Sequence, residues 1–505
     1  MRHVIKKQVL ELKLATDKDM FRIQQKAGDY YYQHILPAIE KVLDGLTDGE
    51  HVIQIDKLEV DLGEMEWEDT RQEIRAEDLY LKIEKEANKI VHQIIDQQYL
   101  NTRYGKISVV LEKPIAQYAC EQWLHYMRNG YLQWNVQDVN EEWRMRVLEA
   151  LATDYALISE IKQLIGTNGN ARQRLINDHP VSFLVKLMEV LTATEQQSLP
   201  KWVQEIDRVL SKGEKKLIQP DERPTSKITG WIWQQYLTGA VEGKSHIDIA
   251  KGILQKQLPD QQWDDVAFYK DELSLLWPVL ELAQDKSSSQ DAEPFILLNK
   301  NVDAVTGSTP KDSKDIREKD KVGNELIKDE NKGESALPAD GIFAPNAGLV
   351  LLHPFLRHLF LHTGLTENEK FISKESQEKA IGLLHFVATG NTKSEEYQLV
   401  VPKILCGYPL ELSPDNNIIL KETEKEEAID MMKAAIGQWT IIKNTSIDGL
   451  REGFLERNGK IFTKNDDTCF VLETRAIDIL LDHLPWNLSI IKLPWRKELI
   501  KVEWR

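Results

Sequence analysis

The sequence predicts a predominantly helical α+β protein built from more than one domain. Apolar residues recur at helical spacing through most of the middle of the chain, and they alternate, as in strands, near both ends. One long polar stretch lacks the apolar residues that a core needs. At 505 residues the chain exceeds what a single hydrophobic core usually organises, so we expect two or three domains.

These patterns divide the chain into four segments. They are a strand, helix, strand docking unit over residues 1–66, a helical domain over 67–284, a linker over 285–340, and an α+β domain over 341–505. The linker is rich in Lys, Asp, Glu, Ser and Gly, so it cannot bury enough apolar surface to offset the entropy cost of ordering. We expect it to be disordered and to divide the protein in two.

The first segment is predicted to form a small βαβ-like unit. Apolar residues alternate over Val4–Leu14, recur at helical spacing over Asp17–Leu46 with Asp17 as the N-cap, and alternate again over Val52–Leu62. The second alternation slips at Asp56-Lys57, which a β-bulge would explain. Since two strands are too few for a stable sheet, we expect this unit to dock on a partner surface.

The middle of the chain is predicted to be almost entirely helical. Glu68–Tyr104 has the pattern of one long charged helix, and Glu112 to about Leu280 that of several helices separated by Gly, Pro and Asn. Three helix ends share an aromatic residue placed three or four positions before a glycine: Leu124–Gly130, Gln234–Gly239 and Leu384–Gly390. They indicate one of two things. Either the three motifs belong to repeated small helical modules, or each is only an aromatic side chain packed over a glycine-capped helix end.

The last segment is predicted to place helices first and a small sheet last. The expected helices are Gly348–Thr363, Ser373–Thr389 with Gly390 as its C-terminal cap, Glu395–Leu405 and Glu422–Lys443. The expected strands are Lys460–Lys464, Cys469–Glu473, Ser489–Leu493 and Leu499–Trp504. Asn458-Gly459 has the sequence of a hairpin-type turn.

Charge and hydropathy exclude several classes of partner. The chain has 64 Lys and Arg against 81 Asp and Glu, and the net charge of -17 opposes binding to nucleic acid or to an anionic membrane surface. The longest apolar run, Gly348–Leu361, is interrupted by polar residues and is shorter than the roughly 20 residues of a spanning helix. Because the amino terminus also lacks the apolar core of a signal peptide, we expect no membrane insertion and synthesis in the cytoplasm.

No catalytic, cofactor-binding or metal-binding residue is predicted. His358 and His362 are spaced to grip a metal, but with His353 they are better explained as histidines flanking a buried helix face around Pro354. The sequence has no GxxxxGK[ST] loop, no GxGxxG after a strand and no GxSxG elbow. The acidic run Glu422–Glu427 is interpreted as a solvated helix start, where carboxylates favour the helix dipole.

Cysteine and tryptophan usage indicates cores rather than special chemistry. Cys120, Cys406 and Cys469 lie far apart with no CxxC pair, so we expect buried thiols in a reducing compartment. We expect most of the 13 tryptophans to be buried, with interface contacts as the alternative. The tripeptides Leu484-Pro-Trp486 and Leu493-Pro-Trp495 are predicted to be wedges that seal the last strands.

Several blocks of sequence resemble one known family. They are NAGLVLLHPFLRHLF from Asn346, LLHFVATG from Leu383, KILCGYPL from Lys403, DGLREGFLERNG from Asp448, DILLDHLPW from Asp478 and, at the start, HVIKKQVLELKL, ILPAIEKVLD and VIQIDKLEVDLG. In order and spacing they are similar to the contractile injection system tape measure family of phage-tail-like particles. The blocks are packing patterns without a catalytic signature, so the resemblance implies a structural rather than an enzymatic protein.

The resemblance leaves the role within such a particle open. One hypothesis is a tape measure or lumen-associated protein that controls tube assembly. The alternative is an assembly factor or baseplate-proximal adaptor that binds tube or spike subunits, and a third hypothesis is a cytoplasmic enzyme with an unrecognised site. A helical ruler gains about 1.5 Å per residue, and with 18 Pro and 26 Gly only Glu68–Tyr104 approaches such a ruler. The resemblance further implies oligomeric assembly with tube, baseplate or spike subunits in the cytoplasm, followed either by release or by retention in the finished particle.

Overall fold

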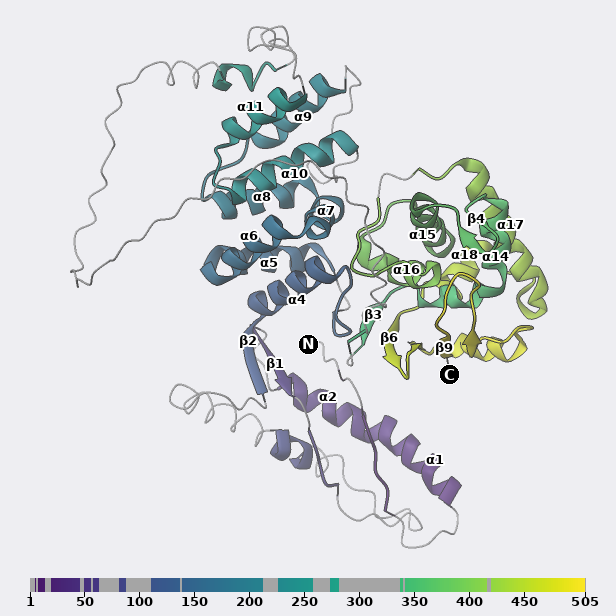
Figure 1. The fold of residues 1–505 in the computed structure, drawn as a ribbon. Helices are drawn as coiled ribbons and strands as arrows, with labels where there is room; N and C mark the ends of the chain where they lie inside the picture. The colour runs from purple at the N-terminus through teal and green to yellow at the C-terminus, as the bar shows by residue number, and fades with distance from the viewer. Residues whose placement is uncertain are drawn as a thin grey trace, which may run out of the picture.

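The computed structural model describes residues 5, 8–13, 20–45, 50–55, 58–62, 81–87, 110–136, 139–211, 226–257, 273–280, 337–338, 341–415 and 419–504. The predicted fold class is confirmed, because the chain is α+β and mostly helical, with a small sheet near the C-terminus (Figure 1). Of the predicted linker 285–340, only residues 337–338 are described, so the predicted division of the chain stays a prediction.

The predicted first helix is present, with one irregular turn. It consists of α1 (Met20–Tyr30), a π-helical turn η1 (Tyr31–Ile35) and α2 (Leu36–Asp44). Pro37 is the second residue after the π turn, and because a prolyl nitrogen cannot donate the regular helical bond, the ladder widens next to it. The helix packs Ile35, Ala38 and Val42 against Ile83 and Ala87, which come from the helical residues 81–87.

The strands of the N-terminal unit differ from the prediction. Residues 8–13 are exposed and belong to no strand, so the predicted strand Val4–Leu14 is wrong in its described part. Alternation marks a segment that could pair, but only a neighbouring strand edge makes it a strand. Strand β1 (His51–Ile55) is shorter than predicted and pairs antiparallel with β2 (Val110–Pro114), part of which was expected to be helical.

Two further predictions for this region fall on residues outside the description. Asp17 and the bulge at Asp56-Lys57 are not described, and of the predicted helix Glu68–Tyr104 only residues 81–87 are. These seven residues are helical, as expected.

The middle of the chain forms a helical stack, which is the name used below for α4–α11 (Figure 1). Its helices are α4 (Ile115–Asn129), α5 (Glu141–Thr153), α6 (Tyr155–Thr167), α7 (Gly169–Asp178), α8 (Val181–Thr192), α9 (Leu199–Leu210), α10 (Lys227–Val241) and α11 (His246–Gln257). Asn140, Asp154, Asn168 and Ser226 each accept a hydrogen bond from a backbone amide in the first turn that follows. These caps explain why the polar residues between the apolar stretches end one helix and start the next.

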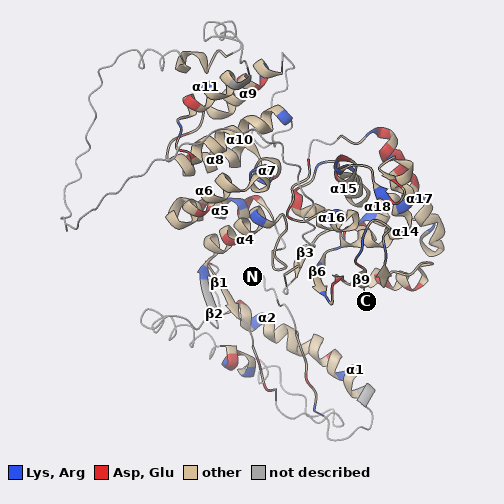
Figure 2. Cartoon of the chain, viewed as in Figure 1, with Lys and Arg blue, Asp and Glu red and all other residues tan. Residues whose placement is uncertain are grey.

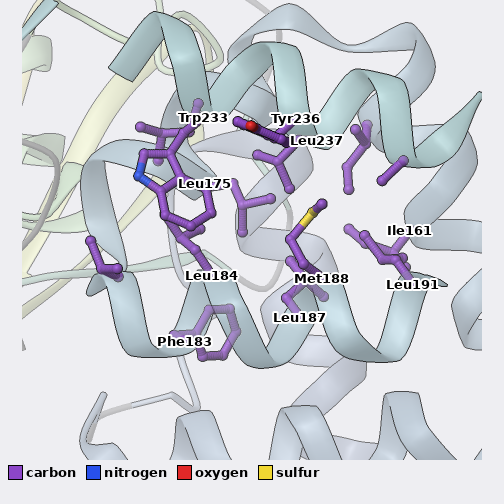
Figure 3. Packing of buried hydrophobic residues seen from close by; sticks show 14 of the residues in the cluster. Ile161, Leu175, Phe183, Leu184, Leu187, Met188, Leu191, Trp233, Tyr236 and Leu237 are labelled. Atoms are coloured by element: carbon purple, nitrogen blue, oxygen red, sulfur yellow. The ribbon is translucent and has the colours of Figure 1, made fainter. Parts of the chain in front are cut away.

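The core of the helical stack draws side chains from all of α4–α11, and α8 and α10 face each other across part of it. Figure 3 shows Trp233, Tyr236 and Leu237 of α10 facing Leu184 and Met188 of α8. All five side chains are buried. Burying one such side chain contributes about 1.5–3 kcal/mol, so the contact between α8 and α10 helps to hold the stack together.

The three aromatic-glycine motifs are not equivalent. Gly130 and Gly390 adopt φ of 76° and 74° and end α4 and α15 (Lys374–Thr389), as glycine caps do. Gly239 instead lies inside α10, where a Cβ atom would stand 2.5 Å from Cγ1 of Ile249. Glycine is needed there for close packing of α10 on α11, so the motif indicates two caps and one contact rather than one repeated module.

The C-terminal unit, residues 341–504, follows the predicted order of helices and then a sheet. Its helical elements are η3 (Ala347–Leu352), α14 (His353–His362), α15 (Lys374–Thr389), η4 (Glu396–Leu399), α16 (Val400–Cys406), α17 (Glu422–Gln438), η5 (Thr440–Ile442), α18 (Ile447–Leu450), η6 (Arg451–Leu455) and η7 (Ala476–His483). Its strands are β3 (Ile342–Ala344), β4 (Thr366–Glu367), β5 (Lys370–Phe371), β6 (Gly459–Lys464), β7 (Asp467–Leu472), β8 (Ile490–Ile491) and β9 (Ile500–Glu503). The four predicted helices and four predicted strands all have counterparts here.

The sheet has the strand order β3-β6-β7-β9-β8, with β7 and β9 parallel and the other neighbours antiparallel. The hairpin turn between β6 and β7 is made by Asn465 and Asp466, whose φ angles are 52° and 63°. The predicted hairpin at Asn458-Gly459 is therefore wrong, because Gly459 begins β6 and pairs with Ala344. Asn, Asp and Gly all tolerate the left-handed region, so Asn458-Gly459 and Asn465-Asp466 both have the composition of a turn. Only the pairing of the strands shows which of the two forms it.

The tryptophans of the two Leu-Pro-Trp tripeptides pack against helical elements of the C-terminal unit, and their role as wedges that seal the last strands stays a prediction. The indole nitrogen of Trp486 donates to the carbonyl oxygen of Leu351 (2.9 Å), and that of Trp495 donates to the carbonyl oxygen of Leu405 (2.7 Å). Trp486 packs edge-on to Phe355, and Trp495 packs against Phe360. Within the described residues every tryptophan is buried or half-buried, which confirms the expectation that most of them serve cores.

Candidate functional site

The most elaborate contact in the structure is a junction between the helical stack and the C-terminal unit, which lie side by side in Figure 1. Strand β3 takes part in both cores, because Phe343 is buried in the core of the stack while Ile342 and Ala344 are buried in the core of the C-terminal unit. Side chains of a strand alternate between its faces, which allows this division. Tyr397 of the C-terminal unit packs against the core of the stack, and Tyr131 of the stack packs against the core of the C-terminal unit.

Backbone bonds also cross the junction. The amide of Phe343 donates to the carbonyl oxygen of Leu132 (3.1 Å), and Gln133 forms an antiparallel bridge with Ile342. Residues 131–136 follow α4, so the loop of the helical stack covers the edge strand β3. An edge strand is normally open to pairing with other chains, and here the protein's own chain occupies it.

Arg174 of α7 lies at the centre of the junction with its side chain fully buried. Its Nε atom is 2.9 Å from Oε2 of Glu396. Its Nη1 atom donates to the carbonyl oxygens of Met127 (2.8 Å) and Arg128 (3.2 Å), and its Nη2 atom donates to the carbonyl oxygen of Glu411. One guanidinium group thus joins α4, α7, η4 and the loop after α16.

Lys403 of α16 approaches the same carboxylate from the C-terminal unit. Its ammonium group donates to Oε1 of Glu396 and to the carbonyl oxygens of Leu410 (3.0 Å) and Leu412 (2.9 Å). Burial lowers the pKa of Lys403, and the negative charge of Glu396 opposes that shift. Because an ammonium group has three donors and all three are used, the carboxylate and the two carbonyl oxygens replace the water that burial removes.

A second carboxylate, Asp178, completes the buried network. Its Oδ1 atom accepts the backbone amide of Glu396 (3.1 Å), and its Oδ2 atom accepts the hydroxyl group of Tyr126. The hydroxyl oxygen of Tyr126 in turn accepts the amide of Tyr397 (3.2 Å). Burial raises the pKa of Tyr126 well above its usual value, so the hydroxyl group stays a neutral donor.

Local sequence places these groups. Arg174 and Asp178 are one turn apart on α7, whose start is fixed by the cap Asn168, so both side chains face the junction. Glu396 begins η4, where Glu395 and Gln398 form a capping box and the side chain of Gln398 accepts the amide of Glu395 (2.9 Å). The helical stack therefore presents its cation and its carboxylate on α7, and the C-terminal unit presents Glu396 on η4 and Lys403 on α16.

Gly130 makes the close approach of the two units geometrically allowed. It ends α4 with φ of 76°, and a Cβ atom there would lie 2.5 Å from Oε1 of Glu396, 2.6 Å from the carbonyl oxygen of Leu410 and 2.7 Å from Nη2 of Arg174. Real Cβ atoms do not come this close to other heavy atoms. The glycine seen from sequence as a helix cap is thus also a contact point between the units.

A rim of polar contacts surrounds the buried network. It consists of the ion pair of Arg144 with Glu395 (2.6 Å), the hydrogen bonds of Asn170 with Ser413 (3.3 Å) and of Gln173 with Pro414 (3.3 Å), and the ion pair of Lys227 with Asp415 (2.9 Å). Sliding one unit over the other would leave buried charges without partners, which is costly. The junction thus fixes how the two units are oriented.

The sequence gives little signal for this site. Arg174 and Asp178 stand four residues apart among polar neighbours, which is also the pattern of an ordinary solvated helix face. Lys403 lies inside an apolar block, and a lysine in such a block is a signal that could have been noticed, because it needs a buried partner.

The histidines considered from sequence lie elsewhere, on α14. The ring centroids of His358 and His362 are 6.1 Å apart, Nδ1 of His362 is 3.6 Å from Glu427, and Nδ1 of His353 is 3.0 Å from the carbonyl oxygen of Val350. Across the described residues, no group of three or more His, Cys, Asp or Glu side chains has the geometry to hold a metal ion.

The other groups considered from sequence are mostly structural. Cys120, Cys406 and Cys469 are buried thiols, as expected. The acidic start of α17 is visible in Figure 2, but it is not wholly solvated, because Glu424 is buried and pairs with Lys379 (2.6 Å). In the part of the chain that the structure describes, no helix is both long and apolar enough to cross a membrane.

Comparison with known protein families gives a match over nearly the whole chain. The model of a family described as contractile injection system tape measure protein matches residues 2–504. No curated protein and no solved structure matches the chain. The matched residues include both the helical stack and the C-terminal unit, so the junction lies wholly inside the family's span.

Proposed function

The chain belongs to the contractile injection system tape measure protein family, and from this premise we propose that it works as an adaptor during particle assembly. In this role its folded units bind tube, baseplate or spike subunits and hold them in a fixed relative position. The protein acts without catalysis, as an oligomeric part of the particle, and assembly takes place in the cytoplasm.

The observation that carries the proposal is the compactness of the described units. The helical stack and the C-terminal unit are joined by a junction with a fully buried ion network. Within these two units the longest helix in the described ranges is α17 with 17 residues, which corresponds to roughly 25 Å. Outside them, α1, η1 and α2 run on as one longer helix over Met20–Asp44. Short helices packed around two cores suit a body that positions partners, whereas a ruler needs long uninterrupted helix.

A second candidate function is supported by the family's description as a tape measure. In this role the length of one segment of the chain sets the length of the tube. Glu68–Tyr104 is the segment whose sequence suits it, because it is predicted to be one continuous charged helix.

Length changes within Glu68–Tyr104 distinguish the two roles. Inserting or deleting five whole turns, about 18 residues, alters a helix by about 27 Å. For an adaptor, we expect tubes of unchanged length or no assembled tubes, whereas a ruler would lengthen or shorten the tube in step with the edit. The readout is the distribution of tube lengths in electron micrographs of purified particles.

The matched control for this experiment is the same number of residues inserted within 285–340. An insertion there leaves the helix pattern of residues 68–104 intact, so neither role predicts a change in tube length. A tube that scales with the edit in Glu68–Tyr104, and not with the control insertion, would contradict the adaptor proposal.

A further inference from the structure

The N-terminal part of the chain contains a repeated sequence. HVIKKQVLELKL (His3–Leu14), called the first repeat below, and HVIQIDKLEVDL (His51–Leu62), called the second repeat, share His-Val-Ile at the start, Leu-Glu at the eighth and ninth positions, and the final leucine. In both repeats the apolar residues change phase between the third and the eighth position. Segments with the same residues at the same spacing suit the same kind of strand pairing.

The second repeat is packed in the manner of a strand. Its first five residues form β1, which pairs with β2. Residues 58–62 belong to no strand, but their three apolar side chains are half-buried and their two acidic side chains are exposed. Val60 and Leu62 pack against the small apolar cluster formed by the helix Met20–Asp44 and residues 81–87. Such alternating burial is typical of an extended segment that has one face on a helix.

The first repeat is not packed in this way. Residues 8–13 are all exposed, with exposed fractions of 73% for Val9, 39% for Leu10 and 38% for Leu12. In the part of the chain that the structure describes, these six residues belong to no strand and to none of the apolar cores. A single exposed apolar residue is ordinary, but a bare strand pattern is typical of a segment that pairs with the edge of a sheet.

Strand β1 has an edge that such a segment fits. Among the described residues its only strand neighbour is β2. The amide of Ile115 donates to the carbonyl oxygen of Glu50 (2.9 Å), and bonded and non-bonded residue pairs alternate along an antiparallel ladder. The backbone groups of Ile53 and Ile55 therefore point away from β2. Since a sheet of two strands is at best marginally stable, a third strand on this edge would stabilise it.

We propose that the first repeat of one copy of this chain pairs in parallel with the second repeat of another copy. A parallel alignment of the shared residues places Leu10 and Leu12 beside the first two apolar residues of 58–62. The change of phase then falls at the same position in both strands. The two leucines extend the apolar layer on the N-terminal helix, where Tyr30 and Ile39 are only half-buried.

The partner strand comes from a second copy because each chain holds both halves of the contact. One half is a strand segment that lies exposed in its own chain, and the other is an edge without a strand. Exchange of such an element between identical chains is a low-cost route to an oligomer. The charges are compatible with this alignment. Lys13 comes beside Asp61 and close to Glu59, which offsets the like charges of Glu11 and Glu59.

The inference does not depend on the adaptor role, so it is tested on purified full-length protein. Glu11→Cys in one version and Glu59→Cys in a second version of different mass are produced in the same cells and treated with a short bismaleimide. The natural cysteines are buried. We expect a covalent product that contains one chain of each version. The control combines the Glu59→Cys version with Tyr155→Cys, a position that is 82% exposed on the helical stack, and should give about tenfold less product.

A matched pair of variants tests which face of the first repeat is covered. Leu12→Asp, added to the Glu11→Cys version, places a carboxylate against the apolar helix and is expected to lower the yield about tenfold. Val9→Asp changes the opposite face of the same segment and is expected to lower the yield less than about twofold. Both side chains are exposed in the single chain, so neither change should unfold the protein, which circular dichroism checks.

Three results would overturn this inference. The first is a product no more abundant than in the Tyr155 control, and the second is an equal yield from Leu12→Asp and Val9→Asp. The third arises when both new cysteines are combined in one version. A link within that single chain, without any product that joins two chains, would mean that the first repeat pairs in its own chain. The adaptor proposal stands in each case, since its test is the length of assembled tubes.

Discussion

Replacing Glu396 by alanine is expected to lower the free energy of unfolding by about 3–5 kcal/mol, the usual cost of leaving a buried charge without its partner. The change removes the carboxylate that lies between Arg174 and Lys403, both of which are fully buried. Neither cation can reach water without opening the junction. Urea unfolding followed by tryptophan fluorescence measures the effect.

Two further variants show whether the loss of stability comes from the missing charge of Glu396, from the missing shape of its side chain, or from losing any ion pair. Glu396→Gln keeps the shape of the side chain and removes its charge, so it should lose most of the same stability. Asp430→Ala removes an exposed partner of Lys433 and should cost less than about 1 kcal/mol. A Glu396→Gln protein as stable as the unaltered one would show that the ionic network does not hold the junction.

Gly348→Ala is expected to destabilise the C-terminal unit by about 3 kcal/mol, near the upper end for overpacking an interior. Gly348 lies in η3 where it crosses η6, and a Cβ atom would stand 1.7 Å from the carbonyl oxygen of Phe454 and 2.9 Å from the Cα atom of Leu455. Both contacts are with backbone, so no change of rotamer relieves them. The midpoint of thermal unfolding should fall accordingly.

The control for this change is Gly382→Ala in α15. Apart from its chain neighbours and the backbone of its own helix, nothing lies within 4 Å of a Cβ atom built at Gly382, and the residue is inside a helix. Alanine should therefore stabilise that helix by about 0.5–1 kcal/mol. If the two alanine variants unfolded at the same temperature, the close crossing of η3 and η6 would be refuted.

Features that depend on neighbouring residues could be predicted from the sequence. Ser373 accepts the amide of Ser376 at the start of α15, and Gly390 ends the same helix, so both ends of this helix follow from local chemistry. The family resemblance also rests on such blocks, and the family match agrees with it.

Features that depend on distant residues could not be predicted. Residues 8–13 alternate like a strand, yet among the described residues no strand edge lies against them. Phe343 serves a different core from its two neighbours, which no pattern within a three-residue strand can reveal. The junction was missed for the same reason, because Arg174 and Glu396 are paired only once the fold brings them together.

Cutting the chain between its two units is the most direct test of the claim that they form one body. A protease site inserted after Gly307, within 285–340, allows the purified full-length protein to be cleaved without denaturant, and size-exclusion chromatography then reports its mass. Because the buried network and the shared strand β3 hold the units together, we expect the two fragments to elute together at the mass of the intact chain. Fragments that elute separately would contradict the junction.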